Sequence, residues 1–511
     1  MSKSERIPLE DMLKRHFGYA TFRTGQKEII SDVLQGKDVL GILPTGSGKS
    51  ICYQLPARLL EGTTIVVSPL ISLMIDQVKE LKATGFKDVV ALNSFMDYER
   101  RKDVYKNLHH YKLIYVSPEI LQQEELQFYL AKLTIRLFVI DEAHCISQWG
   151  HEFRPDYQRL HTVIEQLGSP TVLALSATAT KDVQEDILTS LHKPNIQKHI
   201  YPMDRSNIVL SVQEVMDNEE KLEIIENMLA NHKVPSLVYF SSKTAAEIVS
   251  HQLRERLPNH RIAFYHGGME QMDRITIQQQ FMNDQLDVVC CTSAFGMGIN
   301  KENIRFVFHY HLPGQLESYI QEIGRAGRDG RRSVSVLLYL KQDEFLPKQL
   351  IQSELPSNHD IERVCQLFAS DADPKALLTN NATQVQTTLE ISETQWRFIT
   401  ANIEKYSGKL ENGLHYDKGK WDEIIEQLKQ IRNERMDIKQ TKLQDMLTWI
   451  HTETCLREKL YTKFQENYTA SSVCCSNCGI NLQEFTPEST IREKEELNWE
   501  KKLKQLLAIG E

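Results

Sequence analysis

Two short stretches decide the fold of this chain: Leu-Pro-Thr-Gly-Ser-Gly-Lys-Ser at 43–50 and Asp-Glu-Ala-His at 141–144. In the first, the glycines let backbone N–H groups turn inward on phosphate oxygens, which a Cβ would obstruct. Lys49 supplies a charge for the β- and γ-phosphates, and the Ser50 hydroxyl suits Mg²⁺. A strand is expected before this loop and a helix after it. The residues expected to contact a nucleotide are Thr45, Gly46, Ser47, Gly48, Lys49 and Ser50.

The acidic stretch supports the same interpretation. Phe-Val-Ile at 138–140 predicts a buried strand that delivers Asp141 at its carboxyl end, where parallel α/β sheets bind ligands. Asp141 is expected to hold Mg²⁺, and Glu142 is expected to orient the attacking water. The loop departs from the usual pattern G-x-x-x-x-G-K-S at its first position, which is Leu43. Loop and acidic pair together predict a parallel sheet that binds and hydrolyses a nucleoside triphosphate.

The composition is ordinary for a globular protein, with 41% hydrophobic and 25% charged residues among 511. No apolar run reaches the roughly 18–20 residues that span a bilayer, and the polar N-terminus lacks the apolar core of a signal peptide. We therefore expect three or four domains, an intracellular location and no membrane partner. The net charge of −9 argues against coating nucleic acid through bulk charge, but it allows binding in one groove, because binding depends on the local field.

The residue pattern alternates strand and helix twice, which predicts two parallel-sheet units of similar size. In the first unit the predicted strands are Asp38–Leu43, Thr63–Ser68, Val89–Leu92, Leu113–Ser117, Phe138–Ile140 and Thr171–Leu175. In the second they are Ser236–Phe240, Ile262–Tyr265, Asp287–Thr292, Arg305–Tyr310 and Ser335–Leu340. The alternation breaks between 200 and 215, which predicts a short link. Two units joined in this way would form a cleft that the nucleotide loop faces.

Beyond residue 345 the chain looks mainly helical. Helices are expected at 359–369, 393–405, 420–431 and 441–467. Ile-Ser-Glu-Thr-Gln-Trp at 391–396 predicts a helix start after a Ser cap. With a small hairpin at 408–416, the piece from 373 to 418 fits a winged helix, and a plain helical connector fits equally well. The charged tail from 488 is expected to be one exposed helix.

An arginine-containing stretch, Gln-Glu-Ile-Gly-Arg-Ala-Gly-Arg at 321–328, lies near the end of the second unit. Arg325 and Arg328 are three residues apart, so on a helix they would share a face. Guanidinium groups suit the charge that develops on a transferring phosphoryl group, which predicts an arginine finger supplied across the cleft. Gln321 joins them among the catalytic candidates. The alternative is a solvated pair of surface arginines.

An aromatic and basic segment follows the acidic stretch directly. Stacking of a base on an aromatic ring contributes about 1–3 kcal/mol, and opening a duplex costs roughly 1.4 kcal/mol per step, so one or two stacked bases offset a step. The segment therefore predicts contact with a single strand of nucleic acid, the alternative being that its aromatic residues belong to the core. Its residues are Trp149, His151, Phe153, Arg154 and Tyr157.

The nine cysteines are scattered along the chain except for one cluster. Four near the C-terminal end include a Cys-x-x-Cys pair, whose spacing suits tetrahedral Zn²⁺, the alternative being unrelated cysteines. Cys290 and Cys291 lie in an apolar run and are expected to be buried small residues. The candidate zinc ligands are Cys455, Cys474, Cys475 and Cys478.

Taken together, these stretches resemble the RecQ family of superfamily 2 DNA helicases over about residues 10–345. The most specific match is Asp-Glu-Ala-His followed by Cys-Ile-Ser-Gln-Trp-Gly-His-Glu-Phe-Arg-Pro-Asp-Tyr at 145–157. Ser68–Gln77 resembles motif Ia, Ala294–Lys301 resembles motif V, and Tyr319–Gly330 resembles motif VI.

The resemblance implies roles for further residues. Tyr19 would stack on adenine, Arg23 would support it, and Gln26 would bond the edge of the base. The aromatic segment would link single-strand binding to hydrolysis, and Ser-Ala-Thr at 176–178 would couple the nucleotide site to the link between the units. The residues expected to bind DNA or to couple it to the nucleotide site are His144, Gln148, Trp149, His151, Phe153, Arg154, Ser176 and Thr178.

The chain departs from the family in its C-terminal part. The family pattern C-x-x-C-x-x-C ends here in Asn481, so Cys474 is a substitute ligand, or Asn481 contributes an oxygen, or the site has weakened. The part of the chain that follows motif VI resembles the C-terminal part of the short, RecS-like form of the family. The expected domains are a first RecA-like domain (1–205), a second (206–345), a helical region with a winged-helix-like insertion (346–440), a zinc segment (441–485) and a charged helical tail (486–511).

The resemblance implies an ATP-dependent DNA helicase that moves 3′ to 5′ on single strands in repair or recombination, with ATP, Mg²⁺ and Zn²⁺ as cofactors. Two alternatives remain: an ATP-switched DNA-binding translocase or recruitment factor with little unwinding, and an RNA helicase of the same superfamily. The expected partners are single-stranded and tailed duplex DNA, and single-strand-binding or recombination proteins. We expect a monomer in the cytoplasm, associated with the nucleoid.

Overall fold

The computed structural model describes residues 8–147, 154–295, 301–370, 382–407, 418–464, 474–482 and 485–487. Its contacts divide the chain into two compact units. The first holds the described residues up to His311, then Glu317–Leu340 and those from Thr452 onward. The second holds Leu312–Leu316 and the described part of Lys341–His451. No described helix combines the length and apolarity needed to cross a lipid bilayer.

The first sheet of the first unit has seven parallel strands in the order β3-β4-β2-β5-β6-β1-β7. Alternate residues of a strand enter opposite cores: Leu40 and Ile42 join one apolar cluster, and Val39 joins another. Both faces are therefore covered, as parallel sheets require. The strands are β1 Val39–Ile42, β2 Thr63–Val67, β3 Val89–Leu92, β4 Leu113–Val116, β5 Ile135–Ile140, β6 Thr171–Ser176 and β7 Gln197–Ile200.

Helices separate these strands along the chain, as the alternating pattern predicts. They are α1 Leu9–Phe17, α2 Gln26–Leu34, α3 Ile51–Leu59, α4 Ile71–Ala83, α5 Tyr98–Lys106, α6 Pro118–Leu121, α7 Glu124–Leu130, α8 Pro155–Gln158, α9 Leu160–Gln166 and α10 Lys181–Ser190. Short 3₁₀ turns, η1 Leu108–His110 and η2 Ala143–Ile146, follow α5 and β5.

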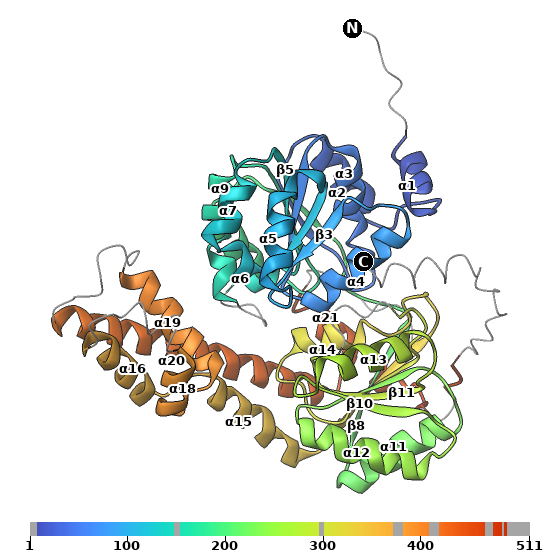
Figure 1. The fold of residues 1–511 in the computed structure, drawn as a ribbon. Coiled ribbons are helices and arrows are strands. Elements are labelled where there is room, and N and C mark those ends of the chain that lie inside the picture. Colours follow the sequence, from blue (N-terminus) through green and yellow to red (C-terminus); the bar gives the residue numbers. More distant parts are fainter. Residues whose placement is uncertain are drawn as a thin grey trace. The chain divides into compact units, whose positions relative to one another are not determined.

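The second sheet has six parallel strands in the order β10-β11-β9-β12-β13-β8. Figure 1 shows α11 and α12 on one side of it and α13 and α14 on the other. The strands are β8 Ile208–Glu214, β9 Ser236–Tyr239, β10 Ile262–Tyr265, β11 Val288–Cys291, β12 Phe306–His309 and β13 Ser333–Tyr339. The helices are α11 Asn218–Ala230, α12 Lys243–Arg256, α13 Gln271–Met282 and α14 Leu316–Ile323.

The link predicted at 200–215 is shorter than that stretch, because Ile200 belongs to β7 and Ile208–Glu214 form β8. Strand β7 pairs with β1 at the edge of the first sheet, and β8 pairs with β13 at the edge of the second. Both are edge strands with mixed exposure, and their polar residues hide the apolar run that marks a central strand. The true linker is therefore only residues 201–207.

The compact unit that holds the described part of Lys341–His451 is helical, as predicted beyond residue 345. Two of the helices predicted there form one helix. Segment 420–431 and the first part of 441–467 belong to the single helix α20, Lys418–Ile450, because no Gly or Pro interrupts residues 432–440. The chain leaves the helix after Ile450, and a separate helix α21 begins at Leu456. The helices of this unit are α15 Phe345–Glu354, α16 Asn358–Ser370, α18 Ala382–Leu389, α19 Glu393–Ser407 and α20. A 3₁₀ turn η3 spans Lys341–Glu344, α21 spans Leu456–Tyr461, and η4 spans Ser476–Cys478.

The predicted start of α19 is confirmed. The Gln395 backbone N–H donates to the Ser392 hydroxyl at 3.2 Å, and the Ser392 N–H donates to the Gln395 side-chain oxygen at 2.9 Å. This reciprocal pair is a capping box. The hairpin expected at 408–416 and the helical tail expected from 488 lie outside the described residues.

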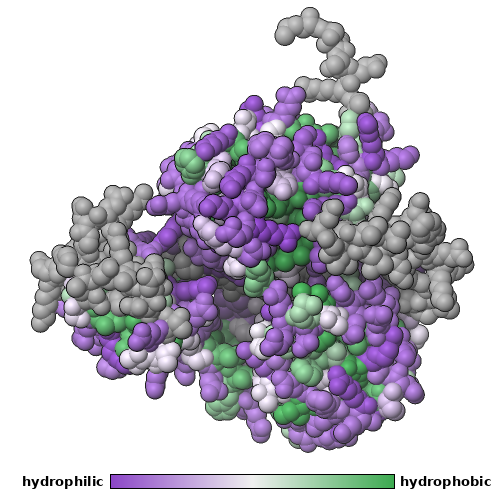
Figure 2. Space-filling view, in the orientation of Figure 1, coloured by the Kyte–Doolittle hydropathy of each residue, from purple (hydrophilic) through white to green (hydrophobic). Residues whose placement is uncertain are grey.

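Hydrophilic side chains cover most of the face seen in Figure 2, and apolar ones are scattered over it. The most exposed large apolar residues lie in different parts of the chain: Met216 between β8 and α11, Met272 on α13 and Phe345 on α15. Scattered exposed apolar side chains are ordinary for a protein surface.

Candidate nucleotide site and nucleic-acid interface

The phosphate loop, residues 43–50, connects β1 to α3. Gly46 and Gly48 have φ of 78° and 75°, a left-handed conformation that favours glycine. Leu43 is fully buried, so the departure from the usual loop pattern fills the core and leaves the loop geometry in place. The Ser47 hydroxyl is buried and has no hydrogen-bond partner among the described residues. A buried polar atom of this kind suits a site that a phosphate oxygen completes.

The acidic pair lies where the sequence predicts it, at the carboxyl end of β5. The Asp141 backbone N–H donates to the Val67 carbonyl at 2.9 Å, which fixes the residue at the edge of the sheet. Burial, and then the neighbouring Glu142 carboxylate, raise the pKa of Asp141 to about 7, while Lys49 opposes the rise. A buried carboxylate with a raised pKa gains stability when a cation binds it. The donor set of Ser50 hydroxyl and Asp141 carboxylate therefore fits Mg²⁺.

Behind the acidic pair, the residues expected to couple the site are connected. The His144 ring Nδ1 lies 3.0 Å from the Ser176 hydroxyl oxygen and 3.4 Å from a Glu142 carboxylate oxygen. The Thr178 backbone N–H donates to the same Ser176 hydroxyl at 3.4 Å. His144, Ser176 and Thr178 are all buried, so they fit coupling through the interior and not direct contact with a strand.

The expected adenine-recognition residues surround the phosphate loop. Tyr19 is 56% exposed, which leaves its ring free to stack on a base. Arg23 donates to the Gly46 carbonyl at 2.5 Å. The Gln26 amide donates to the Ser47 and Gly48 carbonyls at 2.9 and 3.0 Å, so in this structure it supports the loop.

The arginines of the second sheet also reach the phosphate loop. A Cβ added to Gly46 would lie 3.1 Å from the Arg328 Cγ, and one added to Gly324 would overlap the Thr45 side chain. Burial, then Arg325 and Arg205, lower the pKa of Arg328 to about 9. Guanidinium groups crowded together in this way are stabilised by an anion. The contact supports an arginine finger and disfavours solvated surface arginines.

The helical argument for Arg325 and Arg328 is wrong, because α14 ends at Ile323 and both arginines lie in the turns that follow it. We call residues 324–330 the arginine turn. Gln321 is on α14 itself and is buried. Arg325 lies against Tyr239 of β9 and close to Arg328, but the two arginines do not share a helix face.

Two linker residues in contact with this turn were missed by the sequence prediction. Arg205 donates to the Thr45 carbonyl at 3.0 Å and to the Gly327 carbonyl at 2.5 Å. Asn207 donates to the Gly327 carbonyl at 2.8 Å. The only sequence signal was a polar cluster, Asp-Arg-Ser-Asn at 204–207, inside a stretch interpreted as a link.

Of the aromatic segment, Gln148, Trp149, His151 and Phe153 lie outside the described residues, as do positions 296–300 of the motif V stretch. Arg154 is partly exposed, and its guanidinium lies 3.5 Å from Glu119. Tyr157 does not belong to an exposed loop: it is fully buried on α8, and its hydroxyl donates to the Asp141 carbonyl at 3.2 Å. The sequence analysis assigned Tyr157 to base stacking, but in the structure its hydroxyl supports the backbone of the acidic pair.

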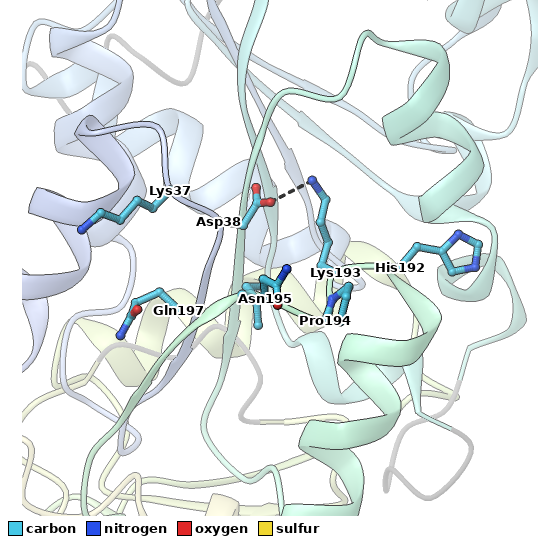
Figure 3. Close-up of a pocket in the computed structure, with 8 residues that line it drawn as sticks. Lys37, Asp38, His192, Lys193, Pro194, Asn195 and Gln197 are labelled. Atoms are coloured by element: carbon cyan, nitrogen blue, oxygen red, sulfur yellow. Dashed lines mark hydrogen bonds and ion pairs between the residues drawn. The ribbon is translucent and has the colours of Figure 1, made fainter.

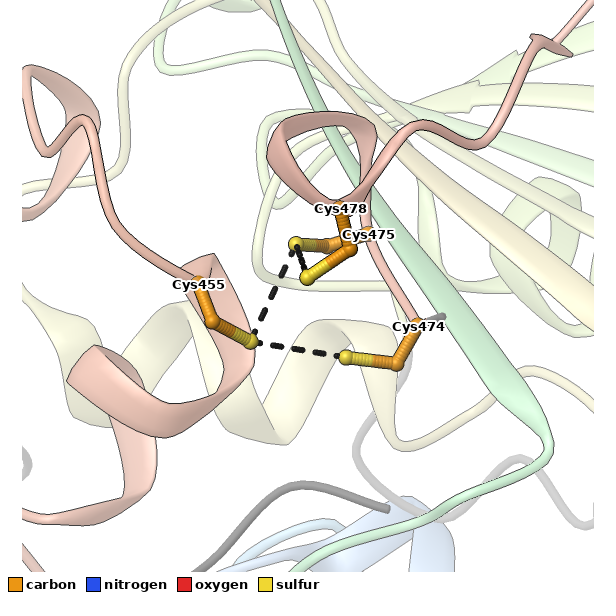
Figure 4. A group of neighbouring side chains, drawn as sticks. All are labelled: Cys455, Cys474, Cys475 and Cys478. Carbon is orange, nitrogen blue, oxygen red and sulfur yellow. Dashed lines mark hydrogen bonds between the residues drawn. The ribbon is translucent and has the colours of Figure 1, made fainter. Parts of the chain in front are cut away.

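The four candidate zinc ligands are brought together. Their sulfur atoms all lie within 4.8 Å of one another, with Cys455 to Cys474 at 3.5 Å and Cys475 to Cys478 at 3.4 Å. A tetrahedral Zn²⁺ with Zn–S of about 2.3 Å has S–S edges of about 3.8 Å, so four thiolates here fit zinc. Figure 4 shows the side chains converging from the start of α21 and from the segment beside β8. Cys290 and Cys291 are buried in β11, as predicted.

A separate pocket of about 390 Å³ lies at the other end of β1, and Figure 3 shows its lining. Asp38 precedes β1, whereas the phosphate loop follows it. The charges are internally paired, with Lys193 at 2.8 Å from Asp38 and Lys37 at 2.8 Å from Asp32. The pocket is therefore distinct from the nucleotide site.

Comparisons with known proteins agree with this geometry. The DEAD/DEAH box helicase family matches residues 23–186, and the helicase conserved C-terminal domain matches 220–330. The chain is 39% identical to the "Probable ATP-dependent DNA helicase RecS" of Bacillus subtilis, over 98% of both chains. It is 40% identical to the "ATP-dependent DNA helicase RecQ" of Haemophilus influenzae, over 72% of this chain and 60% of that protein.

Solved structures share the fold at low sequence identity. The helicase Lhr of Mycobacterium smegmatis, bound to ssDNA and AMP-PNP, aligns with a TM-score of 0.56 and 21% identity over 81% of this chain and 61% of Lhr. Mss116p, bound to ssRNA and AMP-PNP, aligns with a TM-score of 0.57 and 18% identity over 79% of this chain and 92% of that one. These neighbours confirm two RecA-like parallel-sheet domains. Its identity with the RecS and RecQ relatives shows that the chain belongs to the RecQ family of DNA helicases, in its short, RecS-like form.

Proposed function

We propose that this chain couples ATP hydrolysis to 3′–5′ translocation on single-stranded DNA and separates duplexes in DNA repair or recombination. The observation that carries the proposal is the packing of Arg328 against Gly46. It places an arginine from the second sheet on the loop that would hold the nucleotide phosphates. Such an arrangement links the state of the nucleotide to the contact between the two sheets, as a motor needs.

Within the site, each residue has a distinct task. Lys49 and the N–H groups of the loop bind the β- and γ-phosphates, and Tyr19 stacks on the base. Glu142 orients the water that attacks the γ-phosphorus. Mg²⁺, held by Ser50 and Asp141, would neutralise phosphate charge when bound. Arg328, supported by Arg325 and Gln321, stabilises the charge on the transferred group.

Coupling to DNA runs through the interior behind the acidic pair. The His144–Ser176 contact connects Glu142 to the segment that precedes α10, and Tyr157 connects Asp141 to α8. The aromatic segment 148–154 lies between η2 and α8 in the chain, so a base stacked on Trp149 or Phe153 would pull on both. Gln148, His151 and Arg154 supply polar and phosphate contacts around the stacked bases.

The four cysteines are proposed to bind one structural Zn²⁺, with Cys474 in the place of the missing family ligand. Asn481 is exposed, which disfavours it as the fourth ligand. A structural zinc would fix α21 to the edge of the second sheet. Metal analysis of the purified protein should give one zinc per chain, and Cys475→Ser should lower that content.

We further propose that the protein acts as a monomer on single-stranded and tailed duplex DNA in the cytoplasm, at the nucleoid, alongside single-strand-binding or recombination proteins. The domain limits proposed from the sequence, 1–205, 206–345, 346–440, 441–485 and 486–511, remain proposals, as does a winged-helix-like fold for the helical region.

The test is ATP-dependent strand displacement on matched duplexes with a 3′ tail or a 5′ tail. Separation of only the 3′-tailed duplex supports the proposal, and the Lys49→Ala variant serves as the inactive control. The chain spans only 60% of the Haemophilus RecQ, so a second candidate is a translocase or recruitment factor with little unwinding. DNA-stimulated hydrolysis without strand separation would favour that candidate. Stronger stimulation by RNA than by DNA would contradict both.

A further inference from the structure

The linker between the two sheets contacts both halves of the nucleotide site. Arg205 reaches the phosphate loop through the Thr45 carbonyl and the arginine turn through the Gly324, Ala326 and Gly327 carbonyls, at 3.0, 3.4, 3.3 and 2.5 Å. A Cβ on Gly46 would lie 3.1 Å from its Nη1 atom. The guanidinium of Arg205 therefore bonds both to the phosphate loop and to the arginine turn that carries Arg328.

Asn207 strengthens the same arrangement from the other side of the linker. Its amide donates to the Gly327 carbonyl and to the Arg331 carbonyl, both at 2.8 Å. Gly327 has a φ of 53°, and a Cβ there would lie 2.5 Å from the Asn207 amide nitrogen. The turn is thus shaped to receive the linker, one residue before Arg328.

The cysteine segment holds the linker in turn. Arg457 on α21 is buried and lies two residues from Cys455. Its guanidinium donates to the Asp204 carboxylate, to the Ile208 carbonyl and, at 3.1 Å, to the Arg205 carbonyl. On the same side, Leu210 of β8 donates its N–H to the Cys474 carbonyl at 3.3 Å. The backbone that carries Arg205 is therefore fixed by the segment that carries the four cysteines.

We propose that Arg205 is a positioning residue for ATP hydrolysis, which holds the arginine turn against the phosphate loop, and that Arg457 sets the backbone from which Arg205 acts. The proposal rests on the hydrolysis proposed above and extends it to the linker and to the cysteine segment. Arg205 binds backbone carbonyls and not the reacting atoms, so its effect passes through Arg328. Partial burial lowers the pKa of Arg205, and a partly buried guanidinium loses stabilisation if its carbonyl partners are lost.

Steady-state hydrolysis by the full chain, with saturating single-stranded DNA, tests the first part. Because misplacement of a catalytic group costs up to about 100-fold, Arg205→Ala should lower kcat by about 10- to 100-fold and change the KM for ATP by less than about threefold. Arg205→Lys keeps the charge but loses the planar fork, so it should not restore kcat. Arg457→Lys should lower kcat by about three- to tenfold. Lys459→Ala, which removes an exposed cation from the same helix, is the matched control and should be silent.

Hydrogen exchange decides the inference without relying on activity. In Arg205→Ala, the amides of 43–50 and 324–330 should exchange about tenfold faster while the strands of both sheets stay protected. In Arg457→Lys, the faster exchange should appear at 204–208. Unchanged exchange overturns the inference, whether or not kcat falls, since Arg205 would then act on the nucleotide itself. Faster exchange with native kcat overturns it too. Failure of the native chain to hydrolyse ATP overturns the proposed function, and the exchange comparison still decides the contacts.

Discussion

At the scale of single residues, the nucleotide site contains groups whose surroundings are unfavourable until a ligand binds. Asp141 is buried beside another carboxylate, Arg328 is partly buried beside other guanidiniums, and the Ser47 hydroxyl is buried without a partner in the described part of the chain. Each imbalance has the sign that a cation or a phosphate would correct. The residue types alone predicted this chemistry, because few others bind phosphate and metal at that spacing.

Lys49→Ala tests the phosphate loop. Loss of the only lysine in the loop removes a charge that stabilises the transferring phosphate, so hydrolysis should fall by at least about 100-fold. The measurement is ATP turnover with and without single-stranded DNA. Lys27→Ala, an exposed lysine paired with Glu10, is the matched control. Turnover near the native value in Lys49→Ala would refute the site assignment.

The free energy of unfolding is expected to depend on pH through His311. Burial, and then Lys221, lower its pKa to about 4 from 6.5, and its neutral ring accepts the Ser241 N–H at 3.2 Å. Between pH 6.5 and 4 the unfolded chain binds more protons at this residue than the folded chain, so stability falls as pH falls, by roughly 3 kcal/mol in total. Above pH 6.5 this contribution is fully present.

The melting temperature of the native protein should therefore drop more between pH 7 and pH 4.5 than that of His311→Asn, whose amide can still accept the bond. His359→Asn, at an exposed position, should keep the native pH dependence. Equal drops for native protein and His311→Asn would show that His311 does not govern the acid limb.

At the scale of elements, the sequence located every central strand and the edge strands β3 and β10, but it missed the edge strands β7 and β8. Central strands such as β5 are continuous apolar runs, whereas β8 carries Ser211, Gln213 and Glu214 and becomes a strand only through pairing with β13. The same loss hid Arg205, since a linker of seven residues was interpreted as a longer irregular stretch. Helix α20 was divided because its middle is highly charged, although nothing there stops a helix. Tertiary partners, and not local preferences, fix these elements.

The capping box of α19 gives a local prediction. Ser392→Ala removes the acceptor for the Gln395 N–H and should destabilise the start of α19 by about 1 kcal/mol. Hydrogen exchange of the α19 amides measures the change locally, which suits a chain with several domains. Thr388→Ala, whose hydroxyl bonds within its own helix α18, should shift exchange far less. An unchanged α19 would show that packing alone sets its stability.

The aromatic segment gives a prediction drawn from sequence alone. Trp149→Ala should leave basal hydrolysis in place but remove most of its stimulation by single-stranded DNA, because a stacked base can no longer act on the acidic pair. Phe128→Ala removes a 61% exposed aromatic ring from α7 and is the matched control. Full stimulation of Trp149→Ala would show that the segment is structural.

At the scale of the whole molecule, the proposed catalytic site draws on residues from two sheets. The first supplies the phosphate loop and the acidic pair, and the second supplies the arginine turn, while the linker contacts both. Contacts of this kind, between residues far apart in the chain, cannot be derived from spacing, which is why Arg328 was predicted and its partner Arg205 was not. The residue types at 321–328 predicted the arginine finger, but nothing in their spacing predicted its support.

The most direct test of this central claim compares Arg328→Ala with native protein for ATP binding and for DNA-stimulated hydrolysis. A finger that acts on the transition state should leave the affinity for a fluorescent ATP analogue within about threefold and lower kcat by about 1,000-fold. Arg332→Ala, at an exposed position four residues further on, should behave as native. Native turnover in Arg328→Ala would contradict the account, because the phosphate loop and acidic pair would then suffice for hydrolysis.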